Sequence, residues 1–237
     1  SPPLLHEEVY SRLSKALMRG EYTPGQKLTL RKLAADLGTS MTPVREAVRQ
    51  LSAFGAVEII PNKHILVKPL TAEKYLEIVD TRKLLEGHAA ARASKRITDR
   101  DIKEITRINE KILFFAKKGQ LQKAMIENHR FHFAIYKIAG SQTLFEAIES
   151  QWLKIGPSLS KYLGDNNGLK IDDHSQEFKT HTALILSLKN RDANASLKAM
   201  NIILDTATKQ LFDALTYQTI LSSSTLEEMW PKEGKIK

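Results

Sequence analysis

The sequence predicts a mainly α-helical protein with two parts: an N-terminal winged helix-turn-helix domain with a small β-hairpin, and a C-terminal all-α helical bundle. Three observations predict this fold. Residues 30–51 contain two short amphipathic segments separated by Gly38-Thr39-Ser40, as in two helices joined by a turn. Residues 57–67 contain two β-branched runs around a basic turn, which is typical of a hairpin. From Ala72 onward, apolar residues recur at helical spacing.

The two amphipathic segments are expected to form a helix pair. The first covers Leu30–Leu37, and Gly38 ends it. The second begins near Thr42-Pro43, because threonine is a suitable N-cap and proline fits a first turn. Away from its apolar stripe, this helix carries Met41, Thr42, Arg45 and Arg49. A helix that presents arginines outward suits the major groove of DNA. The alternative is an ordinary amphipathic pair with solvated charges, but the hairpin at this spacing favours the winged helix.

Two segments precede this pair. Residues Leu4–Met18 are expected to form a helix that braces it, because their apolar residues follow helical spacing. Pro24-Gly25 marks the turn that follows. The segment from there to Leu30 is expected to be extended and to lie beside the wing.

The predicted wing consists of the runs Val57–Ile60 and Ile65–Val67, with Lys63-His64 at its tip. Pro69-Leu70-Thr71 marks the end of this part, because proline cannot extend a central strand and Thr71 can cap the next helix. The expected division is a DNA-binding domain over residues 1–69, a helical domain over 70–218, and a tail over 219–237.

The C-terminal part is expected to be a bundle of about six helices. Helical patterns cover residues 72–95, 99–118, 120–139, 141–163, 174–190 and 192–218. The tail from Thr219 is rich in serine. The sequence does not decide whether it is disordered or anchored by Trp230.

The composition of the chain limits the partners and the cellular compartment that we expect. The net charge is +9, and residues 1–69 carry +4 of it, so positive charge is denser in the N-terminal part and attracts phosphate. No apolar run approaches the roughly 18 residues that a membrane helix needs, and the N-terminus lacks a signal pattern. The absence of cysteine is compatible with a reducing compartment. We therefore expect a cytoplasmic protein without a membrane partner.

Polar residues interrupt the apolar lines of three predicted helices. The residues that would point inward are Arg82, Asn128, His132 and His181. Four converging polar groups in an apolar bundle indicate a ligand pocket, and an inward arginine suits a carboxylate. The alternative is that these groups bond one another or structural water, with Arg82 paired to Glu86 one turn away.

The N-terminal part of the sequence resembles a known family. The stretch PGQKLTLRKLAADLGTSMTPVREAVRQLSAFGAVEIIPNKHILV resembles the winged helix-turn-helix of the GntR family of bacterial transcription regulators. It has the Pro-Gly before the second helix, the Leu-Ala…Leu-Gly-x-Ser helix and the Thr-Pro-Val-Arg-Glu-Ala helix start. The remainder, to about Leu215, resembles the FadR branch with its all-helical FCD effector domain. The resemblance implies a homodimer, more often a repressor, that binds double-stranded DNA at a pseudo-palindromic operator and a small carboxylate-type effector.

The resemblance also assigns DNA contacts. The assigned residues are Arg31, Met41, Thr42, Arg45, Arg49, Lys63 and His64. Arg31 and Arg45 match family contacts to DNA, and Thr42 matches a phosphate contact. Met41 stands where the family commonly has arginine, which removes a potential bidentate contact to guanine. We therefore expect an operator that differs from the family's usual one.

Many effector domains of this branch bind a divalent metal through one aspartate and three histidines. Here Asn128 stands at the aspartate position, His132 and His181 match two of the histidines, and Ile203 stands at the last. An amide is a poor replacement for a carboxylate, and isoleucine cannot ligate. We therefore expect no tightly bound metal and no other cofactor, with His132 and His181 as the residual candidates.

Three functions remain as hypotheses. The first is a regulator controlled by an effector, and the second is a DNA-binding protein with a vestigial pocket. The third is a metal-assisted hydrolase, which needs an open metal with a bound water. The absent ligands, the absence of cysteine and the absence of a glycine-rich phosphate loop argue against an enzyme, so no catalytic residue is assigned.

Overall fold

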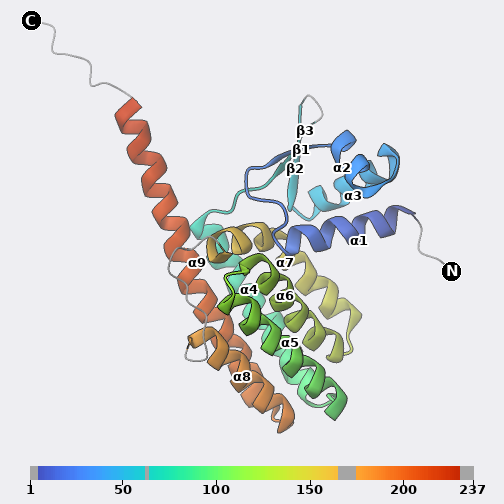
Figure 1. The fold of residues 1–237 in the computed structure, drawn as a ribbon, viewed down its shortest axis with the longest axis vertical. Helices are drawn as coiled ribbons and strands as arrows, with labels where there is room; N and C mark the ends of the chain where they lie inside the picture. Colours follow the sequence, from blue (N-terminus) through green and yellow to red (C-terminus); the bar gives the residue numbers. More distant parts are fainter. Residues whose placement is uncertain (1–4, 62–63, 165–174, 230–237) are drawn as a thin grey trace, which may run out of the picture.

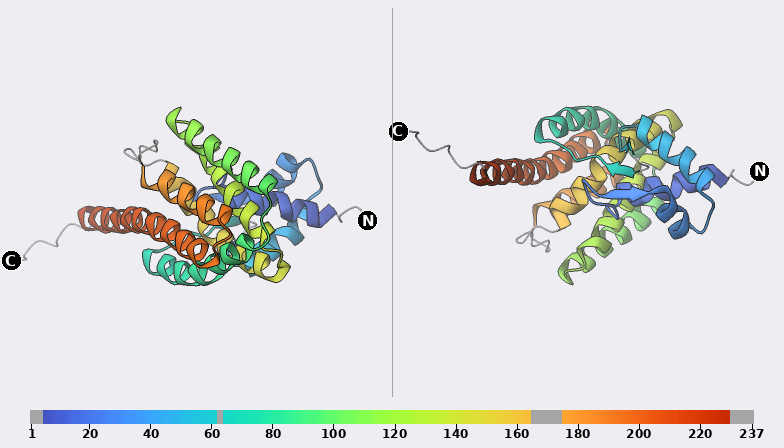
Figure 2. Two further views of the ribbon diagram at one scale, coloured as in Figure 1. Left: turned by 90° about the horizontal axis from the view of Figure 1, so that it is seen from below. Right: turned by 90° about the horizontal axis from the view of Figure 1, so that it is seen from above.

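The computed structural model describes residues 5–61, 64–164 and 175–229, and for 159–164, Glu177, Gln210 and 213–229 it describes the backbone alone. A small winged domain lies at one end of a larger helical bundle (Figure 1). In both views of Figure 2 the last helix leaves the body on the side opposite the first. The two parts of the chain are those that the periodicity predicted.

The winged domain contains three helices and three strands within the described residues. In chain order these are α1 (Leu5–Met18), β1 (Lys27–Thr29), α2 (Leu30–Leu37), α3 (Met41–Ala53), β2 (Val57–Ile60) and β3 (His64–Val67). The antiparallel sheet has the order β1-β3-β2, and Ile65 of β3 pairs with Leu28 on one side and Ile59 on the other. The expectation that the segment before Leu30 lies extended beside the wing is therefore confirmed.

The turn between α2 and α3 follows the prediction at one end and departs from it at the other. Thr29 caps α2 by accepting the Lys32 N–H at 3.2 Å, and Gly38 ends it with φ of 66°. However, α3 begins at Met41 with Ser40 in the N-cap position, so the assignment of Thr42 as the cap was wrong. Proline fits any position of a first turn, since the N–H groups there lack intrahelical partners, so it did not locate the helix start.

An apolar core joins α1, α3 and the sheet. Its members include Val9, Leu13 and Leu17 of α1, Val44, Val48 and Leu51 of α3, and Ile65 and Val67 of β3, all of which are buried. The predicted brace helix therefore packs against α3 and holds it in place.

Within the part of the chain that the structure describes, the bundle contains six helices, in agreement with the prediction of about six. They are α4 (Ala72–Ser94), α5 (Asp99–Lys117), α6 (Leu121–Ile138), α7 (Gln142–Gly164), α8 (Gln176–Lys189) and α9 (Ala193–Met229). Thr71 caps α4 as predicted, accepting the Lys74 N–H at 3.2 Å. Among the described helices, none combines the length and apolarity needed to cross a membrane.

The last helix is longer than predicted. The backbone of α9 continues to Met229, well past residue 218, so much of the segment assigned to a tail is helical. Serine costs a helix far less than glycine or proline, so a serine-rich run does not end it. Trp230 and the rest of the tail lie outside the described residues.

Candidate nucleic-acid interface and buried polar cluster

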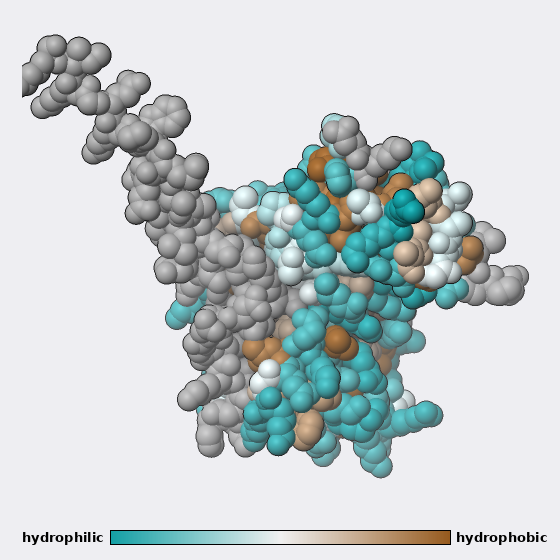
Figure 3. Space-filling view, turned by 45° about the horizontal axis from the view of Figure 1, so that its top comes forward, coloured by the Kyte–Doolittle hydropathy of each residue, from teal (hydrophilic) through white to brown (hydrophobic). Residues whose placement is uncertain are grey.

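The helix pair of the winged domain exposes five of the side chains predicted to contact DNA. We call this set the basic face and define it as Arg31 of α2 with Met41, Thr42, Arg45 and Arg49 of α3. All five are exposed, whereas the opposite side of α3 is buried in the domain core. Figure 3 shows one side of the molecule, on which both hydrophilic and hydrophobic residues reach the surface of the winged domain. The basic face is thus available to an external partner.

Two arginines of the basic face have no anionic partner among the residues that the structure describes. Arg49 bonds Glu46 of the same helix at 3.1 Å, but both side chains are more than half exposed, so water can replace this bond readily. Arg31 and Arg45 form no ion pair within the part of the chain that the structure describes. Their guanidinium groups retain all five donors for phosphate or base edges.

The N-terminus of α3 is open. Ser40 occupies the N-cap position, but its hydroxyl makes no capping hydrogen bond. The first N–H groups of a helix carry partial positive charge and bind anions such as phosphate. This helix end therefore suits the DNA backbone and adds to the field of the two unpaired arginines.

The wing departs from the prediction at His64. This residue is not in the turn but is the first residue of β3, paired with both Thr29 and Ile60. The residue is half-buried, and Nδ1 is shielded from solvent without a hydrogen-bond partner among the described residues. The β-branched run predicted that the strand begins at Ile65, one residue too late, because histidine is not a strong strand former. Lys63 lies outside the described residues.

The bundle encloses a polar cluster centred on the carboxylate of Glu86, which we call the Glu86 cluster. Arg82 donates to it from Nε at 2.6 Å and from Nη2 at 3.3 Å. Tyr136 donates its hydroxyl at 2.5 Å, and Trp152 donates Nε1 at 3.1 Å. Tyr136 also contacts Nδ1 of His132 at 3.1 Å. The hydroxyl proton of Tyr136 is donated to Glu86, so the hydroxyl oxygen of Tyr136 accepts a hydrogen bond from His132. The imidazole of His132 therefore carries its proton on Nδ1.

A second buried histidine lies next to this cluster. Nδ1 of His181 is 3.1 Å from the side-chain oxygen of Asn109, and the rings of His132 and His181 have centroids 5.5 Å apart. Burial lowers the pKa of His181 to about 4 and the pKa of His132 well below its ordinary value. Both imidazoles are therefore neutral at pH 7, because the charged form is disfavoured away from water.

The structure brings together three of the four residues predicted to point inward. Arg82, His132 and His181 are buried close to one another, whereas Asn128 is half-buried and forms no hydrogen bond within the described residues. The pairing of Arg82 with Glu86 is the alternative that the sequence left open. Tyr136 was identifiable, since it lies one turn from His132.

The remaining partners were not identifiable from the sequence. Asn109 and Trp152 come from other helices, α5 and α7, and no local spacing connects them with His181 or Glu86. The contacts that orient the buried histidine and carboxylate are therefore tertiary.

The residues present do not fit the metal site that the family resemblance suggests. Its four positions hold Asn128, His132, His181 and Ile203, which supply two imidazoles, one neutral amide and one alkyl group. Structural and catalytic zinc sites use at least three protein ligands, and neither an amide nor an alkyl group replaces a carboxylate or an imidazole toward such a metal. Within the described residues, no group of three histidine, cysteine, aspartate or glutamate side chains is arranged to hold a metal ion.

Helix α7 connects the Glu86 cluster with the winged domain. Trp152 bonds Glu86, and one turn further on Gly156 lies against the end of α1. A Cβ atom at Gly156 would come within 2.5 Å of the Met18 Cα and 2.7 Å of the Leu17 carbonyl oxygen. Two backbones therefore meet here, an approach that only glycine allows.

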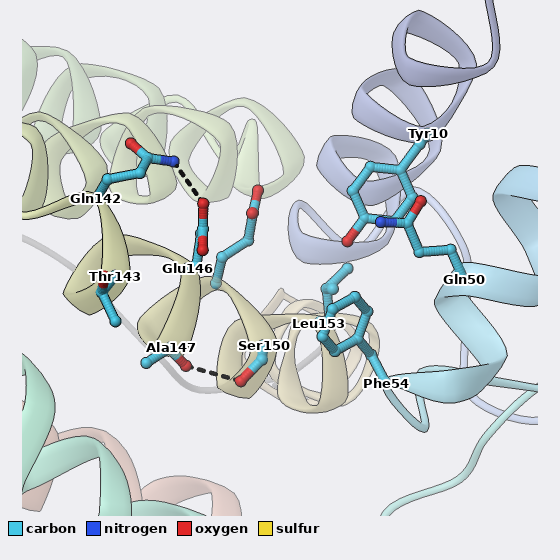
Figure 4. A pocket seen from close by; sticks show the side chains of 10 residues that line it. Tyr10, Gln50, Phe54, Gln142, Thr143, Glu146, Ala147, Ser150 and Leu153 are labelled. Atoms are coloured by element: carbon cyan, nitrogen blue, oxygen red, sulfur yellow. Dashed lines mark hydrogen bonds between the residues drawn. The ribbon is translucent and has the colours of Figure 1, made fainter.

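A groove separates the two domains beside this contact (Figure 4). Its volume is about 610 Å³, and its wall on the winged-domain side is made by Tyr10 of α1 and by Gln50 and Phe54 at the end of α3. Glu146 and Leu153 of α7 lie on the opposite wall. Helix α1, which packs against α7 beside this groove, makes the main contact between the two domains.

Another buried histidine lies near this junction. His129 of α6 stacks on Phe133 with ring centroids 4.1 Å apart, and neither of its ring nitrogens has a hydrogen-bond partner in the described part of the chain. Burial, followed by the charges of Arg19 and Lys15 on the α1 side, lowers the pKa of His129 to about 3. This histidine is therefore neutral and uncompensated inside the protein.

The winged domain with its unpaired arginines, joined to a helical bundle with a polar interior, defines a DNA-binding regulatory protein of two domains. Residues 5–67 match the bacterial regulatory proteins of the gntR family, and residues 77–206 match the FCD domain. The chain therefore belongs to the GntR family of bacterial transcription regulators that carry an FCD domain. The proteins of these families are regulators, so the protein is not an enzyme and the hydrolase hypothesis falls.

Individual relatives agree with this assignment. The chain is 30% identical to the HTH-type transcriptional regulator McbR of Escherichia coli K12 over 185 residues. This aligned region covers 78% of this chain and 82% of that protein. The structure of E. coli McbR/YncC superposes with a TM-score of 0.80 at 28% identity, over 92% of this chain and 99% of that one. A putative GntR regulator from Rhodococcus sp. RHA1 has a TM-score of 0.70 at 19% identity, covers 88% of this chain and 98% of that one, and supports the fold alone.

Proposed function

We propose that this protein is a repressor that binds double-stranded DNA as a homodimer and responds to a small organic acid held in its helical domain. The observation that carries the proposal is the basic face, on which Arg31 of α2 and Arg45 of α3 are exposed and form no ion pair within the described residues. A groove helix of this kind reads base edges with its N-terminal residues. A symmetric dimer would place two such helices on a pseudo-palindromic operator.

The proposed sign of regulation has support from relatives. A protein of Paenarthrobacter nicotinovorans that is 25% identical over 78% of this chain is described as a probable D-xylose utilization operon transcriptional repressor. RspR of E. coli K12, 21% identical over 83% of this chain, is described as a transcriptional repressor. Bound to an operator that overlaps a promoter, the dimer would exclude polymerase.

The proposed effector site lies around the Glu86 cluster and His181. Arg82 supplies a buried positive charge for a carboxylate, and the neutral rings of His132 and His181 supply acceptors for hydroxyl groups. An incoming acid would compete with Glu86 for Arg82, since both are carboxylates. Half-buried Asn128 would contact the ligand from α6.

Transmission to DNA would run through α7. Trp152 donates to Glu86, and Gly156 lies on the backbone of α1, so a ligand that redirects Glu86 would shift both contacts together. Because α1 packs on α3, a shift of α1 would change the orientation of the basic face. An effector acts only through such a difference in its affinity for the two arrangements.

Operator binding is tested with full-length protein. A duplex is first selected from a random library, and its affinity is then measured for wild type and Arg45→Ala. Loss of a base or phosphate contact should weaken binding by about 1–3 kcal/mol. Arg107→Ala is the matched control, because Arg107 is an exposed arginine on α5 that bonds Glu104 and lies outside the basic face. Equal affinity for Arg45→Ala and wild type would mean that α3 does not enter the groove.

Effector binding is tested by thermal unfolding with a library of small carboxylic acids. A ligand of the native state raises the unfolding temperature by mass action. The active acid should also change operator affinity, and Trp152→Phe should weaken that change because it deletes the indole donor to Glu86.

One observation favours a second function, a DNA-binding protein without an effector. Arg82 and Glu86 already satisfy each other, and Tyr136 and Trp152 complete the bonds of the carboxylate. A buried carboxylate that is paired and hydrogen-bonded in this way needs no ligand to satisfy it. Under this function, operator binding is retained and no acid in the library changes the unfolding temperature.

A further inference from the structure

Met41 is the apolar member of the basic face. It is the first residue of α3, 48% exposed, and it lies one helical turn from Arg45 on the same side of the helix. A single exposed apolar side chain is ordinary at a protein surface. Its place is not ordinary, because the N-terminal residues of a groove helix are those that meet base edges.

The chemistry of methionine restricts what it can meet there. Its thioether chain is flexible and polarizable, and it carries no hydrogen-bond donor. In the major groove the apolar feature of a base pair is the C5 methyl group of thymine, whereas the other edges present donors and acceptors. Methionine against those polar edges would displace water without replacing its hydrogen bonds, which is unfavourable.

Resting on the proposed entry of α3 into the major groove, we infer that Met41 selects a thymine in each operator half-site by packing on its C5 methyl group. The open N-terminus of α3 supports this placement. Ser40 does not cap the helix, so a phosphate can approach the first N–H groups and fix the end of α3 that carries Met41 against the DNA.

The helix geometry also gives the position of this thymine. Residues four apart in an α-helix are separated by about 6 Å along its axis, from a rise of about 1.5 Å per residue. Base pairs are stacked about 3.4 Å apart. The thymine read by Met41 therefore lies within about two base pairs of the base pair next to Arg45, because the rise along the DNA cannot exceed the rise along the helix.

The experiment removes only the methyl group. Each thymine of the selected operator half-site is replaced in turn by deoxyuridine, and the affinity of full-length protein is measured by fluorescence anisotropy. At one position, wild type should lose about fourfold in affinity per half-site, the factor that burial of one such group is worth. Met41→Ala should bind the thymine and deoxyuridine duplexes equally, and Met41→Leu should retain the discrimination.

Two controls separate this inference from the function on which it rests. Leu84→Ala should keep the fourfold discrimination, because Leu84 is a 77% exposed apolar residue on α4 outside the basic face. Arg45→Ala should weaken binding to both duplexes by the same factor. If wild type binds every deoxyuridine duplex as well as its thymine parent, or if Met41→Ala still discriminates, the inference is wrong while DNA binding stands. If no duplex is enriched, the proposed function fails and the inference fails with it.

Discussion

The contact between α1 and α7 can be tested by adding a single methyl group. Gly156→Ala places a Cβ atom 2.5 Å from the Met18 Cα and 2.7 Å from the Leu17 carbonyl oxygen, both backbone atoms. Neither atom can rotate away, so α1 and α7 must separate by about 1 Å to reach ordinary contact distance. The contact between the two domains then opens as a whole.

The magnitude follows from two opposing effects. Overpacking of this kind costs about 1–3 kcal/mol. Replacing a helical glycine by alanine gains back about 1 kcal/mol through helix propensity. A second glycine gives the matched control, because a Cβ at Gly87 of α4 meets the Oδ1 atom of Asn201 at 2.8 Å, the end of a side chain that can turn aside. The difference between Gly156→Ala and Gly87→Ala therefore isolates the backbone clash at about 1–3 kcal/mol.

The assay is thermal unfolding of both variants, followed by operator affinity. For a chain of this size, 1 kcal/mol corresponds to about 2–4 °C, so Gly156→Ala should unfold several degrees below Gly87→Ala. Its operator affinity in the absence of ligand should remain measurable, since the basic face is untouched, whereas any effector response should weaken. Equal unfolding temperatures for the two variants would refute a backbone-to-backbone contact at Gly156.

Two further predictions concern buried groups. Glu86→Gln should lower the free energy of unfolding in urea by about 3–5 kcal/mol, because it leaves the charge of buried Arg82 unpaired. The control Glu104→Gln, at the exposed ion pair with Arg107, should change this free energy little. Because the pKa values of His129 and His181 are lowered to about 3 and about 4, their unfolded forms bind protons first as pH falls below 6.5. Stability should therefore fall by about 2 kcal/mol per histidine between pH 7 and pH 5, and His129→Phe should remove one such contribution. A pH slope unchanged by His129→Phe would contradict the burial of a neutral ring there.

Much of the fold is determined by local spacing in the sequence. The apolar periodicity of residues 30–51 produces α2 and α3, since each helix must turn its apolar stripe toward a core. Gly38 and Thr71 set a helix end and a helix start through conformations and bonds that involve only their neighbours. The inward direction of Arg82, His132 and His181 likewise follows from the 3.6-residue period, and all three are buried.

The partners of those groups were decided by the tertiary structure alone. Trp152 reaches Glu86 across 66 positions of sequence, and Asn109 meets His181 across 72, distances over which no pattern of spacing carries information. The close contact between α1 and Gly156 was also decided by the tertiary structure, because the approach of two backbones depends on how whole helices pack. Periodicity states which way a side chain points, whereas only the packing of helices against one another determines what it meets there.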